Sequence, residues 1–323
     1  MTANIAIVGA GMAGLIAGHA WPTAQIFERG AEPTQSHKAL LRFRSDVVAN
    51  LTGVEFKQVL VRKGIWARGG FTAPSIRLAN QYAQKCIGVL AADRSIWNLD
   101  PSQRFIAPTD FHEQLMAGVR GRVAYGVNAF LADELPLARS LISTAPLPVV
   151  ADALDVFPQG QEFLRAPIYV LRYDLGPKCD VYQTIYFPDP ELSLYRASIT
   201  GRMLIIEFAD TAAPLYQTEC FTTVAQAFGL EASRGWDALD EVKQQYGKIA
   251  HIDDAVRKAL LFRLTHEFNI YSLGRFATWR NILLDDVVQD IAVVKRLMKG
   301  GNYELRHASG SSVMPPYPEP QRG

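Results

Sequence analysis

The clearest pattern of apolar and polar positions along the chain lies in its first thirty residues. Residues 5–8 read Ile-Ala-Ile-Val, a short apolar run of the kind that forms a parallel strand buried on both faces. Residues 15–20 continue with helical character, and residues 25–28 form a second apolar run that ends in the acid Glu28. The pattern predicts a strand–helix–strand unit at the start of the chain.

The turn between the first strand and the helix is rich in glycine. Gly9 would allow a tight turn, Gly11 would let a phosphate approach the backbone, and Gly14 would let the helix pack on the strands. Glu28 lies nineteen residues after Gly9, where a dinucleotide site places the acid that binds a ribose. The full motif is Gly9-Ala10-Gly11-Met12-Ala13-Gly14. It predicts a nucleotide site, and the alternative is a glycine-rich turn without a ligand.

The middle of the chain predicts further elements of both kinds. We expect a helix followed by a strand at residues 111–126, and Thr109 or Asp110 can cap the helix. Residues 141–148 predict an apolar strand that ends in proline, where the chain would leave the sheet and pass to another domain. We also expect a helix at 46–51, a strand at 57–66, and partial helix at 73–90.

Residues 149–250 have a different character, with short strand-like runs separated by Gly and Pro turns. We expect strands at 168–174, 183–187, 193–199 and 203–208, and helices at 212–229 and 236–246. The end of the chain returns to the first pattern, with a strand at 268–273, a loop at 274–279, and a long amphipathic helix from about 284 to 299 that Asp285 would cap.

These elements predict an α/β protein with a Rossmann-like nucleotide-binding domain and an inserted antiparallel α+β substrate domain. The nucleotide domain is discontinuous and takes residues 1–148 and 251–307, and the substrate domain takes residues 149–250. Residues 308–323 are rich in Ser, Gly and Pro and are expected to form a flexible tail.

Composition bears on metal binding, cellular location and membrane segments, but it indicates no particular reaction. The chain has 323 residues, half of them apolar, a net charge of +1, and three widely spaced cysteines that make no metal-ligand pattern. We expect no metal and a reducing, cytoplasmic location. Residues 5–21 are apolar but follow no basic segment, and no other run is long enough to span a bilayer, so no membrane segment is expected.

One segment departs from this neutral balance. Residues 38–77 carry eight Lys or Arg residues against two acids, Asp46 and Glu55. The segment is either a solvated face with structural ion pairs or an anion-binding surface. In the second case a nucleic acid is a candidate partner, with Trp66 and Phe71 as a stacking face. Binding that falls steeply with salt and depends on Arg62, Lys63 and Arg68 would distinguish the two.

The order of the motifs resembles the FAD flavoproteins related to UDP-galactopyranose mutase, protoporphyrinogen oxidase and the amine oxidases. Four stretches carry the resemblance: residues 5–28, 111–126, 141–148 and 270–287. The last is similar to the C-terminal Gly-Arg-(Phe/Leu)-x-x-(Trp/Tyr) stretch that closes over the flavin in this group. The resemblance implies FAD as cofactor, an oxidoreductase activity, and a small-molecule or anionic substrate.

The resemblance also implies which residues meet the cofactor. Arg275 would set a cation beside the pyrophosphate, unless it is an ordinary surface arginine. The helix that begins near Asp285 would point its positive end at the flavin pyrimidine edge, and Asp285 itself would contact the flavin or only cap the helix. The cofactor residues are Gly9, Gly11, Met12, Ala13, Gly14, Glu28, Arg29, Val123, Gly274, Arg275, Trp279, Leu284 and Asp285.

For catalysis the sequence departs from the mutases, which carry a histidine-rich loop over the flavin. The comparable region here has Arg42 and Arg44, which with Arg196 would orient an anionic substrate. Tyr195-Arg196 resembles a Tyr-Arg pair of the mutases, and His37 is an acid/base candidate or a structural histidine.

No second Gly-x-Gly-x-x-Gly occurs, so we expect no NADPH domain and reoxidation by oxygen. The leading hypothesis is amine-oxidase-like oxidation of a C–N bond of an amine or amino-acid-like substrate, by hydride transfer to flavin. The alternatives are redox-neutral chemistry of the mutase type and a non-catalytic nucleotide-binding protein. The substrate and the oligomeric state do not follow from the sequence.

Overall fold

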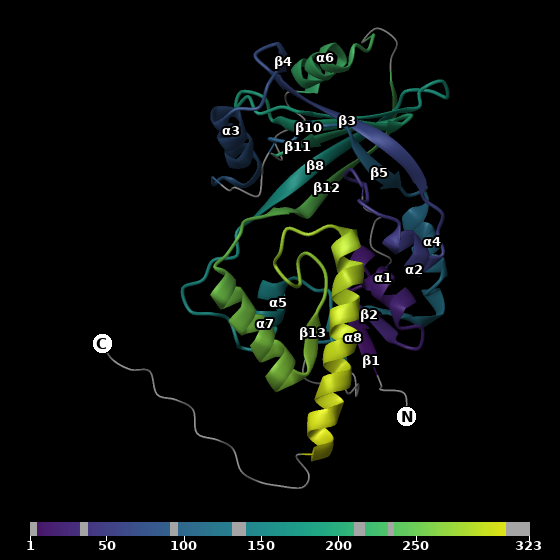
Figure 1. Cartoon of the computed structure of the whole chain (residues 1–323), viewed down its shortest axis with the longest axis vertical. Coiled ribbons are helices and arrows are strands. Elements are labelled where there is room, and N and C mark those ends of the chain that lie inside the picture. Colours follow the sequence, from purple (N-terminus) through teal and green to yellow (C-terminus); the bar gives the residue numbers. More distant parts are fainter. Residues whose placement is uncertain are drawn as a thin grey trace, which may run out of the picture.

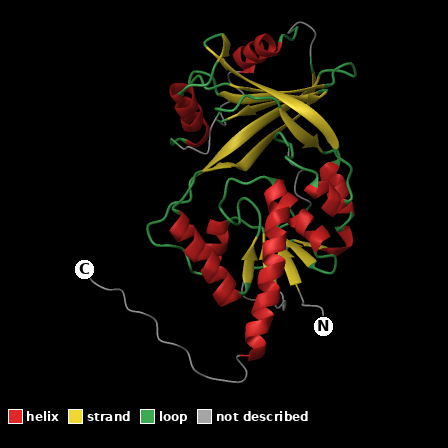
Figure 2. Cartoon of the chain, viewed as in Figure 1, coloured by secondary structure: helices red, strands yellow, loops and turns green. Residues whose placement is uncertain are grey.

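The computed structural model of the chain describes residues 5–32, 38–90, 96–130, 140–209, 217–231 and 236–307. The prediction for His37 and that for the tail from residue 308 lie outside these ranges. The strands form two sheets, one in each half of the molecule, and helices lie against both (Figure 1, Figure 2). Among the described helices, none combines the length and the apolarity needed to cross a membrane.

The first sheet has five parallel strands in the order β13-β7-β1-β2-β6. Its strands are β1 (Ile5–Val8), β2 (Gln25–Glu28), β6 (Val123–Tyr125), β7 (Ser140–Ser143) and β13 (Ile270–Ser272). On β1, Ile7 packs into one buried apolar cluster, and Ala6 and Val8 pack into another. Burial on both faces explains why this strand is apolar throughout rather than alternating.

Helices cover both faces of the parallel sheet. One face carries α1 (Met12–Ala20), α2 (Val47–Thr52), α4 (Phe111–Ala117) and α8 (Leu284–His307), with a 3₁₀ turn, η1 (Arg120–Arg122), after α4. The other face carries α5 (Leu147–Ala153) and α7 (Asp254–Phe268). The predicted Rossmann-like layer is therefore present, built from both ends of the chain.

The second sheet is mixed, in the order β12-β8-β11-β10-β9-β3-β4, with β5 paired to β3. Its strands are β3 (Lys57–Ala67), β4 (Gly70–Thr72), β5 (Ser102–Ile106), β8 (Arg165–Asp174), β9 (Val181–Tyr186), β10 (Leu194–Gly201), β11 (Met203–Phe208) and β12 (Asp237–Ile249). The two faces of the sheet pack in separate clusters, one with α6 (Gln217–Phe228) and one with α3 (Ile76–Ile87).

The strands of residues 149–250 pair antiparallel with one another, as predicted, and the parallel pair in this sheet joins β9 to β3, which lies outside that range. One expectation about this sheet needs correction. The helix predicted at residues 236–246 is wrong, because these residues belong to β12, which pairs with β8. Its apolar positions Ala238, Val242 and Tyr246 are four apart, and that spacing lies on one face of a helix and also of a strand.

The sheets divide the chain differently from the predicted domains. Strands β3, β4 and β5 lie before residue 148, yet they join the second sheet with the strands of residues 149–250. The prediction missed this because pairing between distant strands has no local sequence signal. The division into two domains stays a prediction, and the observed layers are formed by interleaved segments.

Candidate functional site

The turn between β1 and α1 is closed by contacts that only glycine permits. Gly9 has φ +96°, and a Cβ added there would lie 2.5 Å from Thr144 Oγ1. A Cβ at Gly14 would lie 1.8 Å from the carbonyl oxygen of Gly9. Around Gly11, by contrast, an added Cβ would meet no atom within 4 Å. Two glycines therefore fix the turn, and the third faces open space that a phosphate can enter.

Glu28 is fastened over this turn at the end of β2. Its Oε2 accepts a hydrogen bond of 2.7 Å from the backbone N–H of Ala10, and its Oε1 accepts one of 2.9 Å from Gly30. A carboxylate has about four lone-pair sites, so two such bonds leave capacity for ribose hydroxyls. Arg29 beside it is exposed, and Val123 pairs with Ile26 on the neighbouring strands.

The loop after β13 forms the next part of the site. Gly274 has φ +94°, and a Cβ there would lie 2.8 Å from Ala13 Cβ, so this loop packs directly on the first turn of α1. Arg275 follows and donates through Nη2 to Asn281 Oδ1 at 2.8 Å. Trp279 is buried, and its indole donates to the carbonyl of Ala250 at 3.0 Å, which gives it a packing role.

Asp285 joins the start of α8 to the segment after β2. It is 2 % exposed, and its Oδ1 accepts from the N–H groups of Arg44 (3.1 Å) and Ser45 (2.9 Å) and from Ser45 Oγ (3.0 Å). The predicted N-cap role is wrong, because α8 begins at Leu284 and these donors come from another segment. Oδ2 is buried and has no hydrogen-bond partner among the described residues.

The three arginines predicted to hold an anionic substrate all have protein partners. Arg42 donates to Thr184 Oγ1 (2.7 Å) and to the carbonyls of Gln183 (3.0 Å) and Ile199 (2.8 Å). Burial, with a smaller contribution from the neighbouring Arg196 charge, lowers the pKa of Arg42 to about 10.

Arg44 forms an ion pair with Asp286, and Arg196 forms one with Glu207. The roles of all three arginines toward a substrate stay predictions.

A buried polar cluster surrounds the predicted Tyr195-Arg196 pair. Arg196 and Glu207 face each other across β10 and β11, and Nη2 of Arg196 donates to Oε1 at 2.6 Å. The Tyr195 hydroxyl donates to the same oxygen at 3.2 Å, and Lys248 Nζ lies 4.4 Å from the centre of the Tyr195 ring. Tyr195 and Glu207 are wholly buried, whereas the Arg196 side chain is 21 % exposed.

The negative charge of Glu207 is stabilised by the neighbouring guanidinium. Burial alone would raise the pKa of Glu207, but the Arg196 guanidinium outweighs it and holds the pKa below the usual value. Sequence reasoning missed both Glu207 and Lys248. A signal existed for the first, since Glu207 is the one acid in the apolar run Met203–Phe208. We find no comparable signal for Lys248, which lies in a polar stretch of β12.

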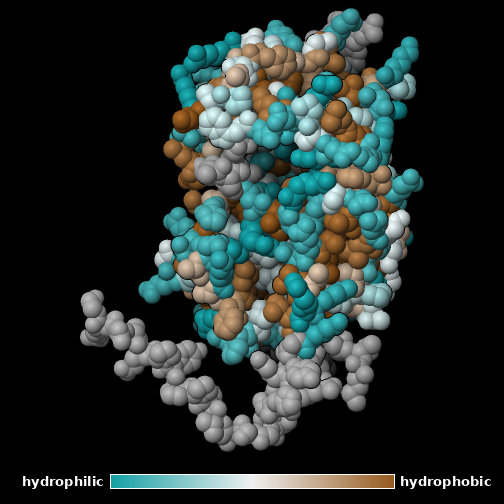
Figure 3. Space-filling model, in the orientation of Figure 1, coloured by the Kyte–Doolittle hydropathy of each residue, from teal (hydrophilic) through white to brown (hydrophobic). Residues whose placement is uncertain are grey.

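A groove of about 1080 Å³ lies where the second sheet meets the nucleotide-binding half, between strands of that sheet and the segments beside α2 and α4. The space-filling view shows, as a separate observation, that the surface is hollowed between the two halves (Figure 3). Phe56 forms part of the wall of the groove, and its ring packs 4.6 Å from that of Phe43, beside the Arg44–Ser45 segment. Clefts of this size commonly hold small molecules. The groove therefore offers room for a small molecule, although none of its lining residues belongs to α8 or to the predicted site.

The basic segment is partly neutralised within the protein. Lys38 lies 3.3 Å from Asp240, Lys57 lies 3.1 Å from Asp180, and Arg44 pairs with Asp286. Structural ion pairs therefore account for several of its cations, and binding of a nucleic acid stays a prediction. Within the described ranges, no group of three or more His, Cys, Asp or Glu side chains is placed to hold a metal ion.

Comparison with known proteins identifies the fold. No protein-family model and no curated protein sequence matches the chain. Reduced UDP-galactopyranose mutase matches with a TM-score of 0.63 and 13 % identity, over 93 % of this chain and 94 % of that one. An oxidoreductase from Methanosarcina mazei matches at 0.54 and 9 % identity, over 91 % and 100 %.

A protein from Pyrococcus furiosus also matches, at a TM-score of 0.53 and 10 % identity, over 90 % of this chain and 96 % of that one. At such identities the likeness establishes the fold alone. The resemblance expected from four short stretches is thus confirmed as a shared fold, and this chain has the architecture of UDP-galactopyranose mutase over nearly its whole length.

Proposed function

We propose that this chain is an FAD-dependent oxidoreductase that oxidises a C–N bond of an amine or amino-acid-like substrate. The observation that carries the cofactor assignment is the open space at Gly11, bounded by Glu28 and by the Gly274 loop. A Cβ added at Gly11 would meet no protein atom within 4 Å, whereas one added at Gly9 or Gly14 would clash with neighbouring atoms. A pyrophosphate fits that space and takes hydrogen bonds from the helix start.

The residues present fit FAD along the whole path. Glu28 would accept the adenosine ribose hydroxyls, the first turn of α1 would hold the pyrophosphate, and Arg275 would add a fixed charge beside it. The N-terminus of α8 would lie at the pyrimidine edge of the flavin, where its dipole favours added negative charge. Bound FAD supplies a ring that accepts a hydride from the substrate.

The buried cluster on β10 and β11 supports the proposed substrate class. It brings the cations Arg196 and Lys248 together with the acid Glu207, and the charge of Arg42 acts on Arg196 from nearby. The guanidinium of Arg196 uses two N–H groups on Glu207, and its remaining N–H groups would donate to a substrate carboxylate. Glu207 would hold that guanidinium in place, and Tyr195 would fix Glu207, so the cluster would orient an amino-acid-like substrate.

Anaerobic reduction of the flavin tests this proposal. The FAD-loaded protein would be mixed without oxygen with panels of amines, amino acids and nucleotide sugars, and flavin absorbance followed. Bleaching by an amine or amino acid is expected. Turnover of a nucleotide sugar only after chemical reduction, without net oxygen use, would favour redox-neutral chemistry. A protein that takes up no FAD would overturn the proposal.

Arg275→Ala is expected to weaken FAD binding by about 1–3 kcal/mol, the value of a charge-assisted hydrogen bond. A titration of the apoprotein followed by flavin fluorescence measures it. Asn281→Ala is the matched control, since it removes the Arg275 partner at 2.8 Å but keeps the charge. An unchanged dissociation constant in Arg275→Ala would remove this residue from the cofactor site.

A further inference from the structure

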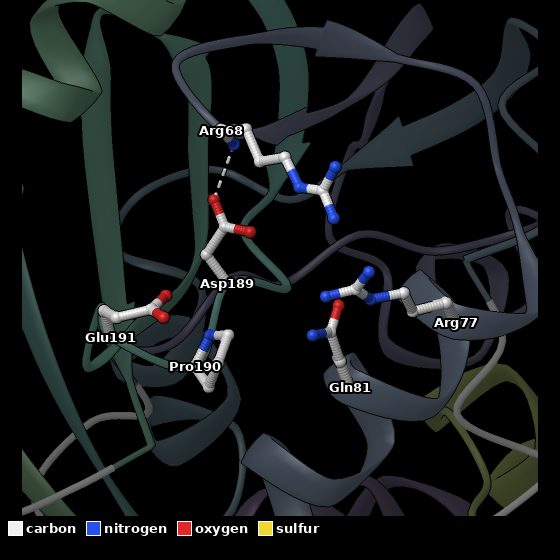
Figure 4. A pocket seen from close by; sticks show the side chains of 6 residues that line it. All are labelled: Arg68, Arg77, Gln81, Asp189, Pro190 and Glu191. Atoms are coloured by element: carbon white, nitrogen blue, oxygen red, sulfur yellow. Dashed lines mark hydrogen bonds between the residues drawn. The ribbon is translucent and has the colours of Figure 1, made fainter.

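A second, smaller pocket lies at the end of the molecule that carries β4, away from the parallel sheet (Figure 1). Its volume is about 240 Å³, and its walls come from the β3–β4 hairpin, helix α3 and the turn between β9 and β10. The lining residues are Arg68, Arg77, Gln81, Asp189, Pro190 and Glu191 (Figure 4). None of them has a part in the proposed flavin site.

The β3–β4 hairpin turn carries Arg68 in a left-handed backbone conformation that Asn or Gly adopts more easily. Ala67 pairs with Gly70, and the two turn residues Arg68 and Gly69 have φ +53° and +76°. Turns of this kind favour Asn-Gly, because a left-handed conformation is strained for a residue with a long side chain such as arginine. The backbone N–H of Arg68 donates to Asp189 Oδ2 at 2.7 Å, which holds the turn against the β9–β10 connection.

Helix α3 forms the opposite wall in a fixed position. Arg77, Gln81 and Lys85 are spaced by four residues and so share one face of the helix. Lys85 Nζ donates to the carbonyls of Phe187 (2.7 Å) and Leu194 (3.0 Å), at the two ends of the turn that carries Asp189. Burial lowers the pKa of Lys85 to about 8. The three walls are thereby joined to one another.

The pocket is lined by two arginines and two acids, and among the described residues no ion pair joins them. The guanidinium groups of Arg68 and Arg77 approach each other from opposite walls, with the Gln81 amide beside the second (Figure 4). In the described part of the chain, no hydrogen bond or ion pair involves either guanidinium, unlike that of Arg44. One carboxylate oxygen of Asp189 accepts the hydrogen bond from the Arg68 backbone. The Glu191 carboxylate lies beyond Asp189, on the side away from the two guanidinium groups (Figure 4).

We propose that this pocket binds a phosphoryl group, as free phosphate or as a phosphate monoester. Two guanidinium forks facing one space would repel each other, and a compact doubly charged anion between them removes that repulsion and uses their N–H groups. The amide of Gln81 adds a donor. The strained arginine at this turn would then have a function, because its guanidinium would contact the anion.

Arg68→Gly separates this proposal from a structural role of Arg68. Glycine adopts the left-handed turn without strain, so the variant should keep or gain thermal stability while losing at least tenfold in affinity for inorganic phosphate. Titration calorimetry at constant ionic strength, on the full chain with FAD added, measures the affinity. Arg77→Ala should lose phosphate affinity to a similar extent. Arg62→Ala is the control and should keep it, because Arg62 is an exposed arginine of β3 outside the pocket.

The ligand panel decides the chemistry. Inorganic phosphate, a nucleoside monophosphate, acetate and a single-stranded oligonucleotide would be compared. Binding of phosphate or of the monophosphate that both variants abolish supports the proposal, and the tighter of the two identifies the source. Equal binding of acetate, binding of the oligonucleotide alone, or binding unchanged in Arg68→Gly would overturn it. These outcomes do not depend on flavin reduction.

Discussion

Gly14→Ala is expected to disrupt the first strand–helix–strand unit, whereas Gly11→Val is expected to leave the fold intact and abolish FAD retention. The added Cβ at position 14 would lie 1.8 Å from the backbone oxygen of Gly9, and a backbone atom cannot move aside as a side chain can. We expect a loss of stability of more than about 3 kcal/mol. At Gly11 the added atoms would enter only the open space that a pyrophosphate needs.

Two measurements separate these effects. Denaturant unfolding reports the free energy of unfolding, and the ratio of flavin to protein absorbance reports cofactor retention. A Gly14→Ala variant as stable as the parent would show that α1 does not pack on the turn as described. Normal FAD loading in Gly11→Val would place the pyrophosphate elsewhere, whatever the stability of that variant.

The sequence predicted the parallel layer well, because its signals are local. The apolar run of β1, the glycine turn and the strand ending at Glu28 each lie within a few residues of one another. The partial helix expected at 73–90, beside the second sheet, is similar, and α3 (Ile76–Ile87) lies within that range. Such patterns need no knowledge of distant parts of the chain.

The second sheet was harder, because its pairings join distant segments. The parallel contact of β3 with β9 links residues 62–65 to residues 183–186, and no local motif announces it. The same limit applies to the site. Arg44 and Arg196 were recognised as cations, but their partners Asp286 and Glu207 could not be assigned from the sequence. An arginine expected to be free for a ligand is often paired in the fold.

Glu207→Gln is expected to destabilise the protein by about 3–5 kcal/mol at pH 7, because it leaves the buried Arg196 without its counter-charge. Arg196→Met should cost a similar amount by leaving Glu207 unpaired. The double variant should recover at least half of the summed loss, since neither charge then remains. Unfolding in urea measures all three free energies, and the double-mutant cycle gives the coupling.

The pH dependence gives the same pair a second test. The pKa of Glu207 is lowered in the folded state, so its contribution to stability is complete above the unfolded-state value near 4.5. It is lost as the pH falls through the folded-state pKa, and the difference between parent and Glu207→Gln should shrink in that window.

Arg202→Ala, which breaks the more exposed pair with Asp174, is the control and should have little effect. If Glu207→Gln were as mild as this control, the buried pair would not stabilise the second sheet, and the geometry proposed for Arg196 toward a substrate would lose its anchor.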